Sequence, residues 1–404
     1  MCLRSTPRLL AWLSWLSLVT AANLYATHYD GNVYTLSLDR GDNDTYSLSL
    51  ASSLKTCGSM PSWLTFDSGS RTLYCSDETG DASMNGSLTT LAADQDGTLT
   101  EIATAVAPGG GVNNVIYSGD DGAQYIAIAH YSGSAVSTFS LPLDSGAQSL
   151  QVFRYTLSEP KENPQQDSPH PHQVFLDPTG SFVLAPDLGA DLVRVYAIDK
   201  STGQLDSRCA DITYPAGSGP RHGLFWTTEH SVLTSQLKAR QQDGSILYIV
   251  NELDGHLKAF TVTYSSDGCL DFEEIQSFVP YSEDQLPEGA TLSEIRQAGS
   301  SLYVSIRSDH AFPPNDSMVN LDHSSNGTVT FHELTSSYGT VPRTFVINKV
   351  GDLVAIGDQS SSNIAIVTRD AQTGKLGDAV ASLQIGEPGE VGTSTGLSSV
   401  VWDE

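Results

Sequence analysis

Positive charge is scarce in this sequence. Only 20 Lys and Arg stand against 47 Asp and Glu, and the formal net charge is −27 at neutral pH. Such a surface repels phosphate backbones and anionic lipids, so neither a nucleic acid nor a membrane surface is expected as a partner. An anionic substrate would need a local cluster of Arg to be held. Strong acidity is also sufficient to keep a secreted protein soluble.

Long apolar runs are absent beyond the N-terminus, so no segment is expected to insert into a membrane. Residues 1–21 contain two Arg, then an apolar run of 12 residues, then small residues. A transmembrane helix needs about 18 or more apolar residues. The layout is instead typical of a secretory signal peptide, and we expect residues 1–21 to be cleaved and the protein to be secreted.

Cysteine is sparse, with five residues in the chain, and Cys2 leaves with the expected signal peptide. The four that remain are Cys57, Cys75, Cys209 and Cys269. In an oxidising compartment an even number predicts two disulfides, with three possible pairings. We favour Cys57–Cys75 because it closes a short loop. The spacings fit no zinc-site pattern, and neither a metal nor any other cofactor is expected.

Four N-x-[ST] sequons are present, which predicts N-glycosylation of surface loops in a secreted protein. They start at Asn43, Asn85, Asn315 and Asn326.

Sustained helical periodicity is also missing, and short β runs separated by Gly, Asp, Asn and Ser fill the chain. One turn signature recurs, each time with a Gly suited to the positive φ of a hairpin turn. These glycines are Gly97, Gly146, Gly203, Gly268, Gly327 and Gly374. They are spaced 47 to 65 residues apart, about 55 on average.

The stretches between these turns repeat a pattern of about four strands. Such units along a whole chain are typical of a β-propeller, and residues 22–404 have room for about seven. We therefore predict an all-β, seven-bladed propeller with about four antiparallel strands per blade. The N-terminus begins with later strands of a unit and the C-terminus ends with a first strand, so the two ends should share one blade. Residues 22–404 are expected to form a single, monomeric domain.

The Trp-Asp pairs of WD40 propellers are missing, since only Trp402 precedes an Asp. A propeller used only for protein interaction is therefore less favoured. In a propeller the innermost strands line a central channel, and polar residues at equivalent points of successive blades face one another. The polar residues at such points are His170, His172, Arg221, His222, Asn251, Glu252, Glu294, Arg296, Arg307, Arg343, Asp358 and Gln359.

Five segments carry a specific resemblance. In order they are SPHPHQVFLDPTGSFVLAPDLGADLVRVY, GSGPRHGLF, YIVNELDG, LYVSIR and VPRTFVI. Together they resemble the seven-bladed propeller lactonase family, which includes propeller-type 6-phosphogluconolactonase and the fungal carboxy-cis,cis-muconate cyclase. The resemblance covers nearly all of residues 22–404 and implies that the catalytic group is His172, Arg221, Glu252 and Arg307. Arg343 and Gln359 also match recurrent positions of the family and are expected to contact the substrate. His170, which lies close to His172 in the sequence, and His222, which lies next to Arg221, are further expected substrate contacts.

Two features depart from the family pattern: Ile306 is followed by a Pro-rich insertion with a sequon, and the chain begins with an expected signal peptide. Both features affect the expected identity of the substrate more than the expected reaction. The sugar-phosphate pathway is intracellular, so an unphosphorylated aldonolactone is the expected substrate.

Lactone hydrolysis requires an activated water, stabilisation of the developing oxyanion, and a proton for the departing ring oxygen. Either Glu252 or His172 could be the base, with the other delivering the proton. Arg221 and Arg307 could stabilise the oxyanion or hold a substrate carboxylate or phosphate, because a guanidinium presents a planar fork. The same residues could instead close a muconate ring.

Each candidate also has a structural alternative. Glu252 could be a buried carboxylate paired to an Arg, and Arg307 and Arg343 could be salt bridges between blades. GTSTG at residues 392–396 matches a nucleophile elbow but lacks the strand–turn–helix context. The expected function is a secreted lactone hydrolase that opens a sugar lactone. The alternatives are a carboxymuconate cycloisomerase and a non-catalytic cell-surface or wall glycoprotein.

Overall fold

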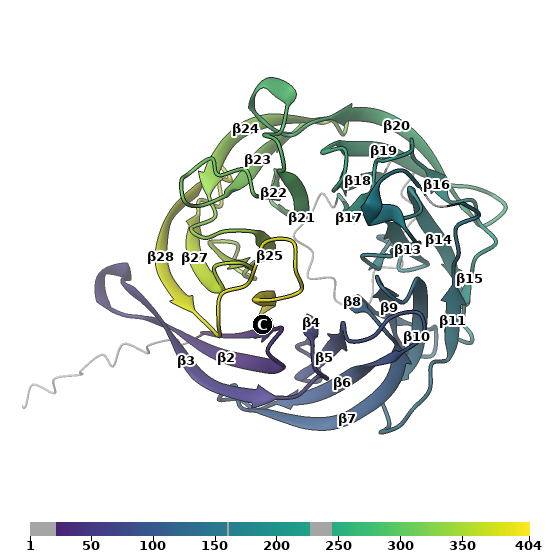
Figure 1. Ribbon diagram of the computed structural model, residues 1–404, viewed down its shortest axis with the longest axis horizontal. Helices are drawn as coiled ribbons and strands as arrows, with labels where there is room; N and C mark the ends of the chain where they lie inside the picture. Colours follow the sequence, from purple (N-terminus) through teal and green to yellow (C-terminus); the bar gives the residue numbers. More distant parts are fainter. Residues whose placement is uncertain (1–21, 160, 227–244) are drawn as a thin grey trace, which may run out of the picture.

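The strands form a ring of seven antiparallel sheets, or blades, around a central axis (Figure 1). The computed structural model describes residues 22–159, 161–226 and 245–404, so the predicted signal peptide lies outside the described residues. Among those residues, six blades have four strands and one has five. The predicted seven-bladed propeller with about four strands per blade is confirmed.

The strands of each blade run in order from the channel outward. Blade 1 contains β4 (Pro61–Asp67), β5 (Thr72–Asp77), β6 (Asn85–Ala93) and β7 (Leu99–Pro108), and blade 2 contains β8 (Gly111–Ser118), β9 (Gln124–His130), β10 (Ala135–Leu141) and β11 (Gln151–Arg154). Blade 3 contains β12 (Phe175–Leu176), β13 (Phe182–Asp187), β14 (Leu192–Ile198), β15 (Leu205–Asp206) and β16 (Ile212–Thr213). Blade 4 contains β17 (Pro220–Phe225), β18 (Ser245–Asn251), β19 (Leu257–Tyr264) and β20 (Leu270–Phe278).

The remaining blades follow the same order. Blade 5 contains β21 (Thr291–Ala298), β22 (Ser301–Arg307), β23 (Ser317–His323) and β24 (Val329–Ser336), and blade 6 contains β25 (Pro342–Ile347), β26 (Leu353–Asp358), β27 (Asn363–Arg369) and β28 (Leu376–Gln384). Blade 7 contains β29 (Leu397–Trp402), β1 (Ala22–His28), β2 (Asn32–Arg40) and β3 (Tyr46–Lys55). The described helices are the 3-10 turns η1 (Asp42–Asp44), η2 (Pro164–Gln166) and η3 (Ser282–Asp284). None of the three could reach across a bilayer as an apolar span.

Blade 7 closes the ring by combining both ends of the chain, as predicted. β29 pairs antiparallel with β1, placing Val401 opposite Tyr25. Asp403, just after β29, receives two hydrogen bonds of 2.8 and 2.9 Å from Arg71 in the β4–β5 turn of blade 1. The Tyr25 hydroxyl donates a third hydrogen bond of 3.0 Å to Asp403. Strand pairing therefore joins the two ends of the chain within blade 7, and this partly buried ion pair joins blade 7 to blade 1.

The turn glycines predicted from the repeat connect the third and fourth strands of blades 1 to 6. All six have positive φ, between 71° and 85°. The turns also dock onto the preceding blade: Tyr248 in β18 donates a hydrogen bond of 2.6 Å to the carbonyl of Gly327 in the next blade. Tyr117, in the innermost strand β8, donates a bond of 2.6 Å to the carbonyl of Gly203, which also lies in the next blade. The repeated glycine thus sets both the turn and the contact between blades.

The hydrophobic core is divided into seven clusters, and each cluster lies between two neighbouring blades. Between blades 6 and 7, for example, Ile364 and Ile366 pack with Leu36 and Trp402. Both faces of each sheet are therefore covered. This two-sided burial explains why inner strands such as β18 are buried throughout rather than alternating between buried and exposed residues.

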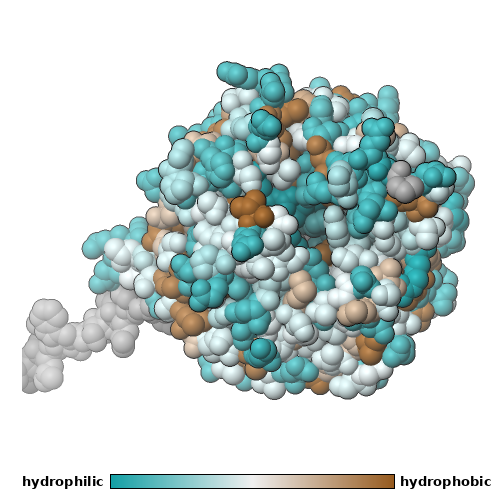
Figure 2. All heavy atoms as spheres, in the orientation of Figure 1, coloured by the Kyte–Doolittle hydropathy of each residue, from teal (hydrophilic) through white to brown (hydrophobic). Residues whose placement is uncertain are grey.

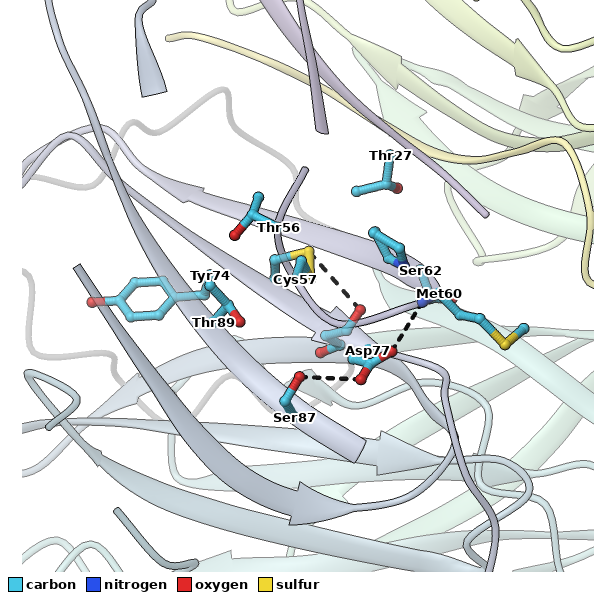
Figure 3. The surroundings of a disulfide bond; sticks show 12 residues. Thr27, Thr56, Cys57, Met60, Ser62, Tyr74, Asp77, Ser87 and Thr89 are labelled. Carbon is cyan, nitrogen blue, oxygen red and sulfur yellow. Dashed lines mark hydrogen bonds between the residues drawn. A yellow bond between two sulfur atoms is a disulfide. The ribbon is translucent and has the colours of Figure 1, made fainter. Parts of the chain in front are cut away.

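The described part of the chain contains two disulfides, Cys57–Cys75 and Cys209–Cys269. The pairing favoured from the sequence is confirmed. Figure 3 shows the first one, which ties the loop after β3 to β5 in the next blade. Asp77 lies beside it and accepts hydrogen bonds from the Met60 amide and the Ser87 hydroxyl. Three of the sequon residues, Asn43, Asn85 and Asn326, are exposed and Asn315 is half-buried, while their glycosylation stays a prediction.

The innermost strands share an irregularity at the end that faces the site. In β17, Pro220 lies opposite Asn251 but His222 lies opposite Val250, which leaves Arg221 as an extra residue. Such a bulge redirects the extra side chain, and bulges are common beside active sites. The other innermost strands with a recorded register shift have their extra residue at Ser62, Val112, Arg343, Ser398, or the Ser293–Glu294 pair.

Candidate active site

A cavity of about 170 Å³ opens at the centre of the ring. Figure 2 shows a recess coloured for hydrophilic residues near the middle of this face. Ligand pockets usually measure about 300–1,000 Å³, so this cavity favours a small solute. Its lining consists of Glu78, Val112, Tyr131, Gln165, His172, Glu252, Val341, Arg307, Arg343, Gln359, Gly392, Thr393 and Ser394.

Several of the lining residues come from two positions that are equivalent between blades. One is the bulge of the innermost strand, which supplies Val112 and Arg343. The other is the residue directly after the second strand, which supplies Glu78, Glu252 and Gln359. The second strand runs antiparallel to the innermost one, so its end lies beside the beginning of its neighbour. Both positions therefore meet at one mouth of the channel.

Glu252 is held between two guanidinium groups. Its Oε2 lies 2.7 Å from Arg221 Nε, and its Oε1 lies 2.7 Å from Arg307 Nη2. Burial alone would raise the pKa of Glu252, but Arg307 and Arg221 outweigh burial and hold it below its ordinary value. The carboxylate is thus firmly anionic and a weak base. It is both a cavity residue and a paired structural carboxylate.

Arg221 lies beneath Glu252 and outside the cavity lining, although the resemblance implied a catalytic role. Its side chain is 1% exposed, and its Nη1 donates a hydrogen bond of 2.8 Å to the Ser293 carbonyl. Burial, followed by the charge of Arg307, lowers the pKa of Arg221 to about 9. Its position suits holding the carboxylate in place rather than contacting a ligand.

His172 reaches the cavity from the segment that pairs with the end of β13, where Pro171 bridges to Asp187. Its Nδ1 is hydrogen-bonded to His222 Nε2 at 3.2 Å. Burial, and then the positive charge of Arg221, keeps the pKa of His172 well below its ordinary value. The imidazole is therefore neutral at neutral pH and has a lone pair with which to accept a proton.

His222 and Glu294 lie deeper in the channel than the cavity lining. His222 Nδ1 lies 3.1 Å from Glu294 Oε2, and Glu294 Oε1 lies 3.1 Å from Arg296 Nε. The ring of Trp63 packs edge-on against His222. Burial lowers the pKa of His222 to about 4, although Glu294 opposes this. The structure therefore does not bring the predicted substrate contact His222 to the cavity surface.

His170 also lies behind the lining. Its Nδ1 is 2.9 Å from the Tyr131 carbonyl oxygen and its Nε2 is 2.8 Å from Asp167 Oδ1. Its ring stacks on Tyr131 with 4.1 Å between centroids. His170 thus supports the cavity wall at Tyr131. Gln359 does line the cavity, and its amide holds the overlying loop through bonds of 2.8 and 3.1 Å to the carbonyls of Thr393 and Thr395.

Glu78 is the main lining residue that the sequence interpretation missed. Its Oε2 accepts hydrogen bonds from the Tyr29 hydroxyl at 2.5 Å and the Ser62 hydroxyl at 2.6 Å. Arg343 Nη2 lies 3.4 Å from the same oxygen. Glu78 follows the second strand of blade 1 as Glu252 follows that of blade 4, so aligning the blades would have found it. Among the described residues, no three His, Cys, Asp or Glu side chains cluster as metal ligands.

Comparisons with known proteins identify relatives along nearly the whole chain. A family model described as "Lactonase, 7-bladed beta-propeller" matches residues 23–393. A protein of Arthroderma benhamiae named "Probable 6-phosphogluconolactonase" is 29% identical over 336 residues, covering 82% of this chain and 80% of the relative. The 6-phosphogluconolactonase of Formosa agariphila is 27% identical, covering 66% and 70%.

Solved structures agree with this fold. A periplasmic gluconolactonase of Pseudomonas aeruginosa superposes with a TM-score of 0.72 at 25% identity, covering 95% of this chain and 99% of that protein. A Lactobacillus plantarum protein at 22% identity superposes with a TM-score of 0.70, covering 90% and 99%.

Proposed function

Because the chain belongs to the lactonase family of seven-bladed β-propellers, we propose that it is a secreted lactone hydrolase that opens a sugar lactone to its acid. The observation that supports this most strongly is the convergence of His172, Glu252, Arg307 and Arg343 on one small cavity. A neutral base can activate water and return the proton to the ring oxygen, and a guanidinium group fixed by a carboxylate can stabilise the oxyanion, as lactone opening requires.

In this proposal His172 is the general base. Its neutral imidazole accepts a proton from water, and the resulting hydroxide attacks the lactone carbonyl. Arg307 stabilises the oxyanion, because its guanidinium is fixed by Glu252 and by a 3.1 Å hydrogen bond to Thr291 before the substrate arrives. The protonated His172 then returns its proton to the departing ring oxygen. Glu252 remains anionic throughout and orients Arg307.

The charge pattern of the cavity supports an uncharged, polyhydroxylated lactone. Glu252 and Glu78 are lining carboxylates, and each has a lining Arg within ion-pair distance, Arg307 at 2.7 Å and Arg343 at 3.4 Å. Carboxylates accept hydrogen bonds from sugar hydroxyls but repel a phosphate. An unphosphorylated aldonolactone is therefore favoured over 6-phosphogluconolactone.

Secretion is supported by the signal-peptide layout of residues 1–21 and by the two disulfides. It also agrees with the choice of an unphosphorylated substrate. Secretion is tested by expressing the full chain in a eukaryotic host and sequencing the N-terminus of protein from the medium. Retention of residues 1–21, or absence from the medium, contradicts it.

The activity is tested by following proton release from glucono-δ-lactone, 6-phosphogluconolactone and a muconolactone, with spontaneous opening subtracted. Wild type is compared with His172→Gln and with His332→Gln, which changes an exposed His on an outer strand. We expect opening of glucono-δ-lactone that falls at least about 100-fold in His172→Gln and is unchanged in His332→Gln. No rate above background from folded wild type overturns the hydrolase proposal. Ring closure of a muconate would favour the cycloisomerase.

A further inference from the structure

Three side chains from successive blades form a line that leads away from the cavity. His172 precedes β12, His222 lies in β17 and Glu294 lies in β21. His172 Nδ1 is 3.2 Å from His222 Nε2, and His222 Nδ1 is 3.1 Å from Glu294 Oε2. The three residues are 6%, 1% and 0% exposed, so water does not compete for these contacts.

The chemistry of the three groups determines where the protons lie. His222 Nδ1 and Glu294 Oε2 approach to 3.1 Å without the geometry of a formed hydrogen bond. Because an ionised carboxylate would repel a nitrogen lone pair at that distance, the approach requires a proton on His222 Nδ1. A neutral imidazole carries one ring proton, which leaves His222 Nε2 as an acceptor. That acceptor in turn requires a proton on His172 Nδ1. The remaining nitrogen of His172, Nε2, is then the one with a free lone pair.

We propose that Glu294 and His222 are positioning residues of a proton relay that fixes His172 as the base and carries charge away from the cavity. The proposal rests on the proposed lactone hydrolysis. Water loses a proton to His172 Nε2 as its oxygen bonds to the carbonyl carbon. The proton on His172 Nδ1 moves to His222 Nε2, which leaves a cationic His222 beside anionic Glu294. When the carbon–oxygen bond of the ring breaks, the protons move back and the ring oxygen takes the proton from His172 Nε2.

The charges around each ring explain why a relay is useful. Burial disfavours a positive charge on His172 most strongly, and the guanidinium groups of Arg221, Arg343 and Arg307 disfavour it further. His222 also faces Arg221 and Arg296, but Glu294 lies in direct contact and compensates its charge. Moving the positive charge from His172 to His222 therefore places it beside the Glu294 carboxylate. The charge also moves away from the two arginines that line the cavity, Arg307 and Arg343.

The first test does not depend on activity. Nitrogen NMR of histidine-labelled free protein distinguishes which ring nitrogen of each His is protonated, and the signals are assigned with His172→Gln and His222→Gln. We expect both rings to carry the proton on Nδ1 near neutral pH, the tautomer that histidine adopts less often in water. A proton on Nε2 of either ring overturns the relay. In Glu294→Gln, we expect His222 to lose its preference for Nδ1.

The second test separates a relay from a structural role. Glu294→Gln keeps the shape of the side chain but removes its charge, and we expect kcat for lactone opening to fall about 100-fold with KM changed less than about threefold. The acidic limb of the kcat profile should also move to lower pH, since His222 then holds a proton less readily. Trp63→Phe, a packing change against the same ring, is the matched control and should stay within about threefold of wild type.

The outcomes distinguish the two proposals. If wild type opens no lactone but both rings are protonated on Nδ1, the proposed function fails and the relay geometry stands. If wild type is active and Glu294→Gln retains kcat within about threefold, the relay is overturned and the function stands.

Discussion

Arg343 and Glu78 lie 265 residues apart in the sequence, yet Arg343 Nη2 lies 3.4 Å from Glu78 Oε2 in the wall of the cavity. The two residues come from blades 6 and 1, on either side of the blade that closes the ring. Burial would lower the pKa of Arg343, but Tyr29 and Glu78 outweigh burial and raise it. The guanidinium is thus permanently charged and already has a carboxylate partner.

Replacing Glu78 by Gln should change the choice of substrate. The variant loses a hydrogen-bond acceptor for sugar hydroxyls and leaves Arg343 without its carboxylate. A hydrogen bond to a charged group contributes about 1.5–3 kcal/mol, so kcat/KM for glucono-δ-lactone should fall roughly tenfold or more. The ratio of kcat/KM for 6-phosphogluconolactone over glucono-δ-lactone should rise, as measured by proton release. Glu101→Gln, a carboxylate outside the cavity lining, is the control, and an unchanged ratio in Glu78→Gln contradicts the assigned role.

Replacing Glu252 by Gln should destabilise the protein as well as inactivate it. The change leaves the buried guanidinium of Arg221 without its counter-charge, and breaking a buried pair from one side costs about 3–5 kcal/mol. The measurement is the urea midpoint of unfolding. Asp44→Asn breaks the pair with Arg40, whose side chains are 73% and 51% exposed, and should cost less than about 1 kcal/mol. Equal midpoints for the two variants would show that Glu252 is not the counter-charge of a buried cation.

Acid should destabilise the fold through buried histidines. Burial lowers the pKa of His130 to about 3, whereas the unfolded chain has a His pKa of about 6.5. Between those values the unfolded chain binds more protons, so the free energy of unfolding falls as the pH is lowered. From about pH 7.5 to about pH 5, His130 should account for a loss of about 2 kcal/mol.

The matching experiment compares urea unfolding at those two pH values. His130→Gln should reduce the pH-dependent loss by about 2 kcal/mol, and the exposed control His332→Gln should not change it. Burial raises the pKa of Asp358, so this residue makes the free energy of unfolding rise as the pH is lowered. Its contribution is the same in wild type and in both variants and does not affect the comparison. The same loss in wild type and His130→Gln would mean that His130 is not buried in its neutral form.

Asp403→Asn should weaken ring closure without touching catalysis. It removes the charge that pairs with Arg71 across the junction of blades 7 and 1, where the Asp403 side chain is 5% exposed. We expect a loss of about 1–3 kcal/mol in unfolding free energy, with kcat and KM unchanged. Asp206→Asn, at an exposed pair with Arg208, should cost less than about 1 kcal/mol. A loss of activity in folded Asp403→Asn would contradict a purely structural role.

The propeller could be predicted because its signals are local and repeated. A glycine with positive φ recurs at one turn of each of six blades, and the two-sided burial of inner strands such as β18 produces continuous apolar runs. Closure of the ring could be predicted because the N-terminus and the C-terminus each carry only part of a four-strand unit. Five of the polar residues expected at equivalent positions of successive blades line the cavity, namely His172, Glu252, Arg307, Arg343 and Gln359, while their roles stay predictions.

The sequence does not predict which side chains reach the cavity surface and which lie beneath it, because this depends on the bulges in the innermost strands. Arg221 and His222 are neighbours in the sequence, and the bulge at Arg221 gives both side chains places beneath the lining. Glu78 was missed because the segment around it lacks the Arg or His that drew attention elsewhere. Glu78 occupies the same position after the second strand of its blade as Glu252 and Gln359. This equivalence becomes visible only when the blades are aligned.

The shared blade has a consequence for the order of events during synthesis. β29 follows every other strand in the chain, yet it forms the innermost layer of the blade that contains β1. Until β29 leaves the ribosome, blade 7 lacks its innermost strand, and Arg71 and Tyr25 have no Asp403 to bind. Blades 1 and 6 are then not held in the positions that bring Glu78 and Arg343 together. The Glu78–Arg343 pair in the cavity wall therefore depends on the last strand of the chain, whereas His172, Glu252 and Arg307 come from blades 3 to 5, which are complete without it.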